Sequence, residues 1–469
     1  MPLDVLVVGA GPAGSVAALV LARAGVDVRL VDSSRFPRDK LCGDTLNPGA
    51  LSVLDRLGVG SRVRERAIPI EGMLVTGPFG ATVACDYPDD LTGAAISRRD
   101  LDVVLLEAAV AAGVDFVPGT PVRGPLYADK GARVAGVRVG GGIADGAGDG
   151  AGHGAGGDVG DGIANDVGDG VGDDLGGVGD DVGGDATHGV RERNMSARIV
   201  IAADGRRSRL AFALGLARLA PAPRRWAFGA YFTGVDGLTS RGEMHIRPDG
   251  YTGVAPLPGG LTNVCVVREL SALHHGERLT GDDVIARALA GDSGLRTRFA
   301  RARQVSAVAS LGPLAVDARA AGCPGLLLAG DAAGFVDPMT GDGLRFALRG
   351  GELAAEAALY ELNTNAPAHE RLRAARYREF SGKWRVNRAL RWLVASPRGV
   401  RLSAAVAMRW SAPVRYLIGV AGDVHLARHG RIDASAHWPR RSGALMTPTH
   451  PGRVAAGGAA PPAPQAPRP

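Results

Sequence analysis

The first 32 residues contain a strand, a glycine-rich turn, a helix and a second strand, and this order strongly restricts the fold. An apolar run at 3–8 leads into GAGPAG at 9–14, helical Ala/Leu/Val spacing continues to residue 24, and a second apolar run at 26–31 ends at Asp32. Glycines at the first, third and sixth positions of the turn permit a tight bend, close approach of a pyrophosphate and contact between helix and strand. The Asp32 carboxylate would accept hydrogen bonds from adenosine ribose hydroxyls and would repel a 2′-phosphate. The pattern predicts a site for FAD or NAD, formed by Gly9, Gly11, Ala13, Gly14 and Asp32.

A second glycine turn, about 300 residues further on, decides between these dinucleotides. The stretch LLLAGDAAGFVDPMTGDGLRFAL at 326–348 places Asp331 at the end of a buried strand, followed by a glycine turn at 341–343 that enters a helix. A dehydrogenase that binds only NAD has no need of this element, so it favours FAD. The N–H groups at a helix start also suit the negative charge of a reduced flavin.

Four stretches together resemble one family. They are the GAGPAG turn, RFPRDKLCGD (35–44) with ISRRDLD (96–102), IVIAADGRRSRLA (199–211) and the Asp331 segment. This combination is similar to the FAD-dependent oxidoreductases of the para-hydroxybenzoate hydroxylase fold, and within them to the geranylgeranyl-reductase-like branch. The resemblance covers residues 1–430, apart from a Gly/Asp-rich insertion.

The resemblance implies roles for further residues. It implies that Asp331 holds the ribityl chain, that Gly343 and Leu344 lie at the flavin ring, and that Cys42 and Gly43 border the isoalloxazine and act in catalysis, with Thr45 beside them. It also implies that Arg98 reaches the FAD phosphates, that Val122 contacts adenine, and that Asp204–Gly205 contributes to FAD and nicotinamide binding. Alternatives from the residues alone stay open: Cys42 and Val122 as core residues, Arg98 as a surface arginine and Asp204 as a helix cap.

The implied fold is an α/β architecture: a Rossmann-like FAD-binding domain, a mostly antiparallel β substrate domain and C-terminal helices. Alternating segments between 224 and 311, separated by Gly/Pro turns, predict the antiparallel sheet. The predicted FAD-binding domain is discontinuous, comprising 1–70, 96–139, 190–215 and 316–360. The substrate domain comprises 71–95 and 216–315. A helical region at 361–435 and a disordered tail at 436–469 follow.

Residues 140–189 stand apart in composition. They contain 21 Gly and 11 Asp and lack Lys, Arg and Glu, so they offer no core whose burial could offset the entropy of ordering. We predict a disordered insertion in a hairpin loop. Its near-repeats have spacings of 8, 8 and 7, which argues against the nine-residue repeat of a calcium-binding β-roll.

Charge and cysteine usage exclude several classes of function. Outside the insertion, 54 basic residues face 48 − 11 = 37 acidic ones, but the arginines are scattered and not interleaved with aromatics, so no nucleic-acid partner is expected. The four cysteines lie far apart without a CxxC, which argues against a disulfide framework and a metal site and fits a reducing cytoplasm. The sequence shows neither a signal peptide nor an 18-residue apolar span, although peripheral contact with a membrane stays open. The oligomeric state is not predicted.

The function expected from this resemblance is that of an FAD enzyme with NAD(P)H as a transient electron donor, since the chain has no second GxGxxG with strand and helix context. The first prediction is reduction of carbon–carbon double bonds in a small hydrophobic, isoprenoid-like substrate. Hydroxylation of an aromatic or polycyclic substrate is the alternative. A non-catalytic binding protein on this fold and a nicotinamide-only dehydrogenase are two further alternatives, and both predict a colourless purified protein.

Two departures from known relatives refine the substrate. Flavin halogenases require an active-site lysine and a WxWxIP motif, and this chain has neither that motif nor a lysine between Lys40 and Lys130. Geranylgeranyl reductases carry YxWxFP, where this chain reads YTGVAP at 251–256. Gly253 and Ala255 replace the two aromatic residues. They widen the predicted pocket, which argues against a geranylgeranyl group as the substrate.

Overall fold

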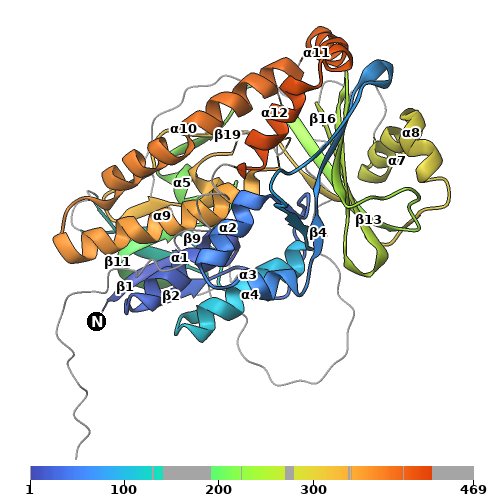
Figure 1. Ribbon diagram of the computed structural model, residues 1–469. Coiled ribbons are helices and arrows are strands. Elements are labelled where there is room, and N and C mark those ends of the chain that lie inside the picture. Colours follow the sequence, from blue (N-terminus) through green and yellow to red (C-terminus); the bar gives the residue numbers. More distant parts are fainter. Residues whose placement is uncertain are drawn as a thin grey trace, which may run out of the picture.

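The computed structural model contains two large β-sheets with helices around them (Figure 1). It describes residues 2–128, 131, 133–140, 192–222, 224–269, 279–335, 339, 341–394 and 396–424. The predicted insertion, apart from Gly140, and the predicted tail lie outside the described residues. The α/β fold class predicted from the sequence is confirmed, whereas the residue bounds of the two domains stay a prediction.

The first sheet has a parallel core in the order β21-β11-β1-β2-β8. Its strands are β1 (Leu3–Val8), β2 (Val28–Val31), β8 (Asp115–Val117), β11 (Arg193–Ala202) and β21 (Leu326–Leu328). Along β1, Val5 and Val7 join one hydrophobic cluster while Leu6 and Val8 join another. Successive side chains of a strand point to opposite faces, so this continuous apolar run buries both faces of the sheet.

Helices cover one face of this sheet, as Figure 1 shows. They are α1 (Pro12–Arg23), α2 (Pro48–Arg56), α4 (Arg98–Ala111) and α9 (Gly343–Thr364), and the short α3 (Gly60–Arg64) precedes β4. α1 and α9 pack very closely at Gly351. A Cβ added there would lie 2.2 Å from the Ala13 carbonyl oxygen, so a larger residue would not fit. Ser97 caps α4, its hydroxyl accepting from the Asp100 amide at 3.1 Å.

The other face is covered by an antiparallel extension and small elements. β9 (Val122–Ala128) and β10 (Arg133–Val139) continue the sheet beyond β11, and α5 (Arg209–Ala213), β12 (Ala217–Leu219) and β19 (Val316–Ala318) lie over it. The two halves of β11 differ in character. Its first residues pair with β10 and include the polar Arg193, Asn194 and Ser196, so they lack the apolar run of the second half.

The second sheet is mostly antiparallel, in the order β17-β13-β16-β15-β14-β5-β6, with β18 beside β13. Its strands are β5 (Gly72–Thr76), β6 (Thr82–Asp86), β13 (Arg225–Thr233), β14 (Arg241–Arg247), β15 (Gly250–Pro256), β16 (Leu261–Glu269), β17 (Arg303–Gln304) and β18 (Ala309–Leu311). A small sheet of β3 (Thr45–Leu46), β7 (Gly93–Ala95) and β4 (Ile68–Ile70) stands beside it. The short edge strand β20 (Gly322–Cys323) pairs with β21.

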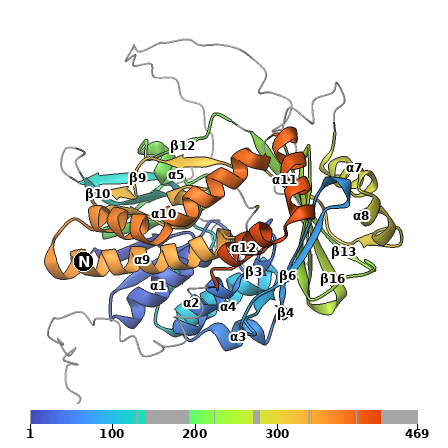
Figure 2. The ribbon, with the colours of Figure 1, turned by 45° about the horizontal axis from the view of Figure 1, so that its top comes forward.

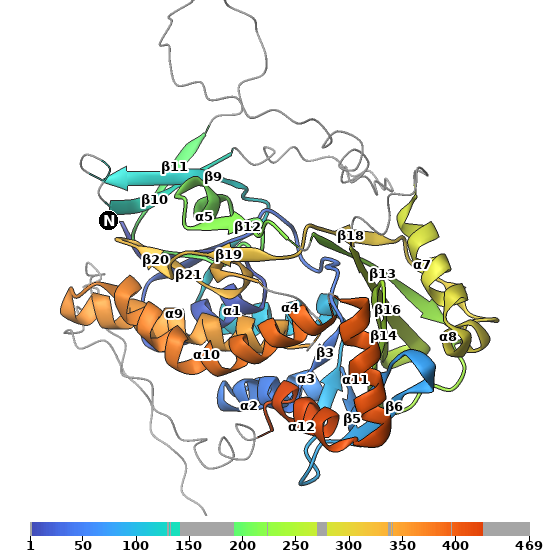
Figure 3. The same ribbon diagram turned by 90° about the horizontal axis from the view of Figure 1, so that it is seen from above.

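Helices lie on both faces of the second sheet, as Figures 1 and 3 show. α7 (Gly281–Gly291) and α8 (Ser293–Arg298) pack on one face, where Val284, Ile285 and Leu295 join its apolar cluster. The opposite side holds α11 (Pro397–Arg409) and α12 (Ala412–Ala421), reached through the long α10 (Ala368–Val394) (Figures 2 and 3). Within the described residues, we find no helix that combines the length and the apolar character required for a membrane span.

Candidate functional site

A cavity of about 620 Å³ lies between the two sheets, at the carboxyl ends of the parallel strands. Ligands of open parallel sheets bind at this edge. Fourteen of the fifteen residues predicted to contact the cofactor line it: Gly9, Gly11, Ala13, Asp32, Cys42, Gly43, Thr45, Arg98, Val122, Asp204, Gly205, Asp331, Gly343 and Leu344. The fifteenth, Gly14, holds α1 against the turn, since a Cβ there would lie 1.8 Å from the Gly9 carbonyl oxygen.

The glycine turn and Asp32 form one hydrogen-bonded unit. Gly9 has φ +99°, which favours glycine, and a Cβ there would meet the Ala203 carbonyl oxygen at 2.4 Å. The Asp32 carboxylate accepts from the Ala10 amide at 2.7 Å and from the Ser34 amide at 2.8 Å. These bonds fix the carboxylate at the end of β2, on the wall of the cavity.

Arg98 lies next to this turn and is held by a buried carboxylate. Its Nε and Nη2 donate to the two oxygens of Asp102 at 2.8 and 2.9 Å, and Asp102 is fully buried. A Cβ added at Gly11 would lie 3.9 Å from Arg98 Nη2, so the guanidinium faces the turn. A bidentate pair fixes an arginine's orientation as well as its charge, which fits the predicted phosphate contact.

Two further aspartates follow parallel strands into the cavity. Asp204 follows β11, and its Oδ2 accepts from the Arg209 amide at 3.0 Å while its buried Oδ1 has no partner among the described residues. Burial raises the pKa of Asp204. Asp331 follows β21 within the 3₁₀ turn Gly330–Ala333, and burial raises its pKa as well. An orphaned buried oxygen on the cavity wall is what a ligand with hydroxyl donors would satisfy, so these residues fit FAD.

Cys42 lies where the cavity meets the second sheet. Burial raises the pKa of its thiol, which is therefore protonated at neutral pH. Its carbonyl oxygen accepts from Asn263 Nδ2 on β16 at 2.9 Å. The second sheet thus positions the backbone of the Cys42 segment directly.

Asp44 anchors the same segment, and sequence reasoning did not assign it a role. It is fully buried at φ +53°, where Tyr231 Oη and Asn263 Nδ2 donate to its Oδ2 at 2.8 and 2.6 Å and the Arg98 amide donates to its Oδ1 at 3.2 Å. Burial raises the pKa of Asp44 to about 6, against the opposing effect of these donors. The only sign of this role in the sequence was the position of Asp44 next to Cys42 and Gly43. Its hydrogen-bond partners lie on strands far away in the sequence.

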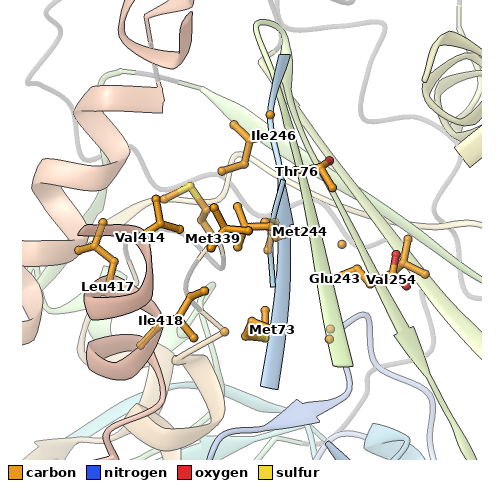
Figure 4. Close-up of a pocket in the computed structure, with 18 of the residues that line it drawn as sticks. Met73, Thr76, Glu243, Met244, Ile246, Val254, Met339, Val414, Leu417 and Ile418 are labelled. Atoms are coloured by element: carbon orange, nitrogen blue, oxygen red, sulfur yellow. The ribbon is translucent and has the colours of Figure 1, made fainter. Parts of the chain in front are cut away.

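A second, apolar cavity of about 260 Å³ adjoins the first. Figure 4 shows Val414, Leu417 and Ile418 of α12 on one side of it and Met73 and Met244 of the sheet on the other. Among its described lining residues, only Glu243 carries a charged group, and Arg298 neutralises that carboxylate through hydrogen bonds of 2.6 and 2.8 Å. Such a lining suits an uncharged, hydrophobic molecule.

The two cavities meet at a shared wall of six residues: Gly43, Thr45, Met244, Gly253, Cys265 and Gly341. Gly253 and Ala255, which stand where relatives carry aromatic residues, both line the apolar cavity. A Cβ at Gly253 would have no atom closer than 3.8 Å, so the space at this position is open. A molecule in the apolar cavity therefore reaches the Cys42–Thr45 segment.

Comparison with known proteins decides the family. An FAD binding domain model matches residues 2–141. Menaquinone reductase of Mycobacterium tuberculosis is 30% identical over 444 residues, covering 90% of this chain and 91% of that protein. The chain belongs to the FAD-dependent oxidoreductases, in their geranylgeranyl-reductase-like branch.

Another relative supports this branch, and two solved structures share the fold. Digeranylgeranylglycerophospholipid reductase 2 of Methanopyrus kandleri is 29% identical, covering 76% of this chain and 77% of that protein. A geranylgeranyl bacteriochlorophyll reductase-like protein from Thermoplasma acidophilum aligns with TM-score 0.66 at 20% identity, over 93% and 97% of the two chains. A flavin-dependent brominase aligns with TM-score 0.69 at 18% identity, over 92% and 99%. The two structural matches show the shared fold. The predicted family, cofactor FAD and enzyme class are thus confirmed, while the individual residue roles stay predictions.

Proposed function

We propose that this FAD enzyme uses electrons from NAD(P)H to reduce a carbon–carbon double bond in a hydrophobic, isoprenoid-like substrate. The observation that carries the proposal is the shared wall between the cofactor cavity and the apolar cavity. The relatives named as reductases of menaquinone and of digeranylgeranylglycerophospholipid support it, because both names denote hydrophobic molecules.

Each part of the chain has a distinct task in this proposal. FAD, when bound, would supply the hydride-transfer chemistry that links NAD(P)H to one carbon of the double bond. Asp32, Arg98 and Asp331 hold the cofactor. The methionine, leucine and valine walls bind the substrate chain and exclude water, which keeps the reduced site dry.

Reduction of a double bond also needs one proton on the second carbon. The Cys42 thiol carries a proton at neutral pH and lies on the cofactor cavity beside the shared wall. We therefore assign Cys42 as the proton donor, with bulk solvent restoring the proton after each turnover. Asp44, Tyr231 and Asn263 act as positioning residues for this segment.

The experiment that tests the proposal starts with FAD-loaded protein reduced by a small excess of NADPH or NADH under argon. Prenylated quinols, whose rings cannot take electrons from the flavin, prenyl alcohols and polycyclic aromatic compounds are then added in turn, and flavin absorbance near 450 nm is followed. A prenylated compound that restores the absorbance at a rate above the blank supports the proposal. If only the ring compounds without a prenyl chain restore it, the proposed substrate class is wrong.

A further inference from the structure

The outward faces of α11 and α12 expose large apolar side chains next to the apolar cavity. Together with neighbouring residues they form what we call the tryptophan–arginine face. Its apolar members, with the exposed fraction of each, are Phe79 (70%), Trp392 (79%), Leu402 (65%), Val406 (40%), Met408 (54%), Trp410 (66%) and Tyr416 (72%). Monomeric proteins rarely expose so many large apolar residues in one region without a binding role.

The elements that carry these residues are neighbours in the fold. The tip of the β5–β6 hairpin, which carries Phe79, lies beside α11 in Figures 1 and 3. A Cβ added at Gly77 in that hairpin would lie 3.4 Å from Ala404 Cβ on α11. Trp392 stands near the end of α10, and Trp410 in the short connection between α11 and α12.

α11 carries apolar residues on both its inner and its outer side, and α12 adds the exposed Tyr416. The inner face of α11 lines the apolar cavity with Val400, Ala404 and Ala407, and the inner face of α12 lines it with Leu417 and Ile418. Their outer faces carry Leu402, Val406, Met408 and Tyr416, all exposed. The inner residues already explain how the helices pack, so the outer apolar residues need another explanation.

The charges on this surface have one sign. Residues 381–422 contain no Asp or Glu but eight basic residues, of which Arg388, Arg398, Arg401, Arg409 and Arg415 are exposed among the apolar ones. Facing copies of this surface would bring arginines against arginines, which disfavours a symmetric dimer here. Arginines interspersed with tryptophan and leucine on short helices match the headgroup region of an anionic bilayer, where phosphates meet acyl chains.

We propose that the tryptophan–arginine face docks this enzyme on the surface of anionic lipid bilayers. The helices lie in the headgroup region with their outer residues inserted, while their inner residues keep lining the apolar cavity. Only the use that the enzyme makes of docking rests on the proposed function: a hydrophobic substrate dissolved in the bilayer would be presented beside the cavity. The docking itself requires only the exposed surface and its charge.

The test is vesicle flotation of the full-length, FAD-loaded protein. We expect the protein to float with vesicles of phosphatidylcholine containing about 30% phosphatidylglycerol, to bind pure phosphatidylcholine much more weakly, and to be partly released at about 1 M salt. The variant W392S/L402S/W410S should lose binding to anionic vesicles by about tenfold or more. The variant R398Q/R401Q/R409Q should lose about tenfold or more on anionic vesicles alone.

Matched controls come from exposed residues elsewhere. L219S/V305S removes exposed apolar groups, and R303Q/R319Q removes exposed arginines, so both should bind like the wild type. None of the substituted face residues lines either cavity. The face variants should therefore keep their flavin absorbance, which shows that they are folded.

Failure of this inference and failure of the proposed function give different results. Wild-type protein that stays with the soluble fraction at every lipid composition would overturn the docking proposal, as would face variants that float as well as the controls. Concentration-dependent dimers in sedimentation that vanish in W392S/L402S/W410S would also overturn it, in favour of a second copy as the occupant. Binding that follows the prediction, from an enzyme that reduces no prenylated compound, would support the docking and contradict the proposed function.

Discussion

Tyr231 on β13 donates a 2.8 Å hydrogen bond from its phenol oxygen to the carboxylate of Asp44, which is 187 residues away in the sequence. This bond ties the second sheet to the segment that carries Cys42. Together with Asn263, it sets where the cofactor cavity and the apolar cavity meet. The geometry of the junction therefore depends on contacts between parts of the chain far apart in sequence.

The buried Asp44 carboxyl should make the stability of the fold depend on pH. Its pKa is about 6 in the folded chain against 3.8 for an ordinary aspartate, so the folded state binds the proton more tightly. The free energy of unfolding should therefore fall as the pH rises from about 4 to about 6, by roughly 3 kcal/mol from this group alone. The Asp44→Asn variant should lack this pH-dependent part of the free energy of unfolding, even if its overall stability also differs from that of the wild type.

Urea unfolding of wild type and Asp44→Asn at a series of pH values measures this difference. Tyr231→Phe removes a donor that lowers the pKa of Asp44. In this variant, the pH range over which the free energy of unfolding falls should therefore extend to higher pH than in the wild type. Asp317→Asn, at a half-exposed carboxyl, serves as the control and should run parallel to the wild type. Parallel curves for wild type and Asp44→Asn between pH 4 and 6 would contradict the assignment.

Loss of either cofactor aspartate should weaken FAD retention. Asp32→Ala removes the predicted ribose acceptor and Asp331→Ala the predicted ribityl partner, and a hydrogen bond that involves a charged group contributes about 1.5–3 kcal/mol. We expect each variant to bind FAD about 10- to 100-fold more weakly, as measured by flavin fluorescence after dialysis, while Asp317→Ala stays like the wild type. Equal flavin occupancy in all four proteins would refute both roles.

Cys42 should matter more for turnover than for cofactor binding. Cys42→Ala removes the proposed proton donor, so turnover should fall by about 100-fold or more while FAD affinity changes less than about threefold. Reduction of the flavin by NAD(P)H should persist, because that step does not need the thiol. Cys323→Ala, at a cysteine that lines neither cavity, is the control. A variant that loses FAD and turnover in parallel would indicate a structural role instead.

Ala255 offers a test of the apolar cavity that leaves the cofactor cavity unchanged. It lines only the apolar cavity, so Ala255→Phe should fill part of the roughly 260 Å³ available there and exclude the substrate chain. We expect normal FAD content and normal reduction by NAD(P)H, with loss of reoxidation by a prenylated substrate. Ala405→Phe, on the exposed side of α11, is the control. Unchanged reoxidation by Ala255→Phe would place the substrate elsewhere.

The local parts of the cofactor site could be predicted from the sequence. The glycine turn, Asp32, Asp204 and Asp331 each follow a buried parallel strand, so strand order alone brings them to one edge of the sheet. The role of Ser97 as the cap of α4 could also be predicted from the sequence, because capping depends on residues three positions apart.

The junction of the two cavities could not be predicted in the same way. The partners of Asp44 come from β13 and β16, about 190 to 220 residues further along the chain, and periodicity carries no information on such pairing. Helices α7 and α8 were also missed, since they are short and lie within a stretch of alternating segments. The capping box between Thr280 and Asp283 was the signal that could have revealed α7.

The most direct test of the central claim is the mass of the product formed under argon. Purified protein should be yellow with bound flavin, lose its colour on addition of NADPH or NADH without oxygen, and regain it when a prenylated hydrophobic substrate is supplied. We expect a product heavier by two hydrogens, formed under argon as readily as in air, with one NAD(P)H consumed for each product molecule. A product that gains one oxygen and forms only in air would contradict the account and identify the enzyme as a monooxygenase.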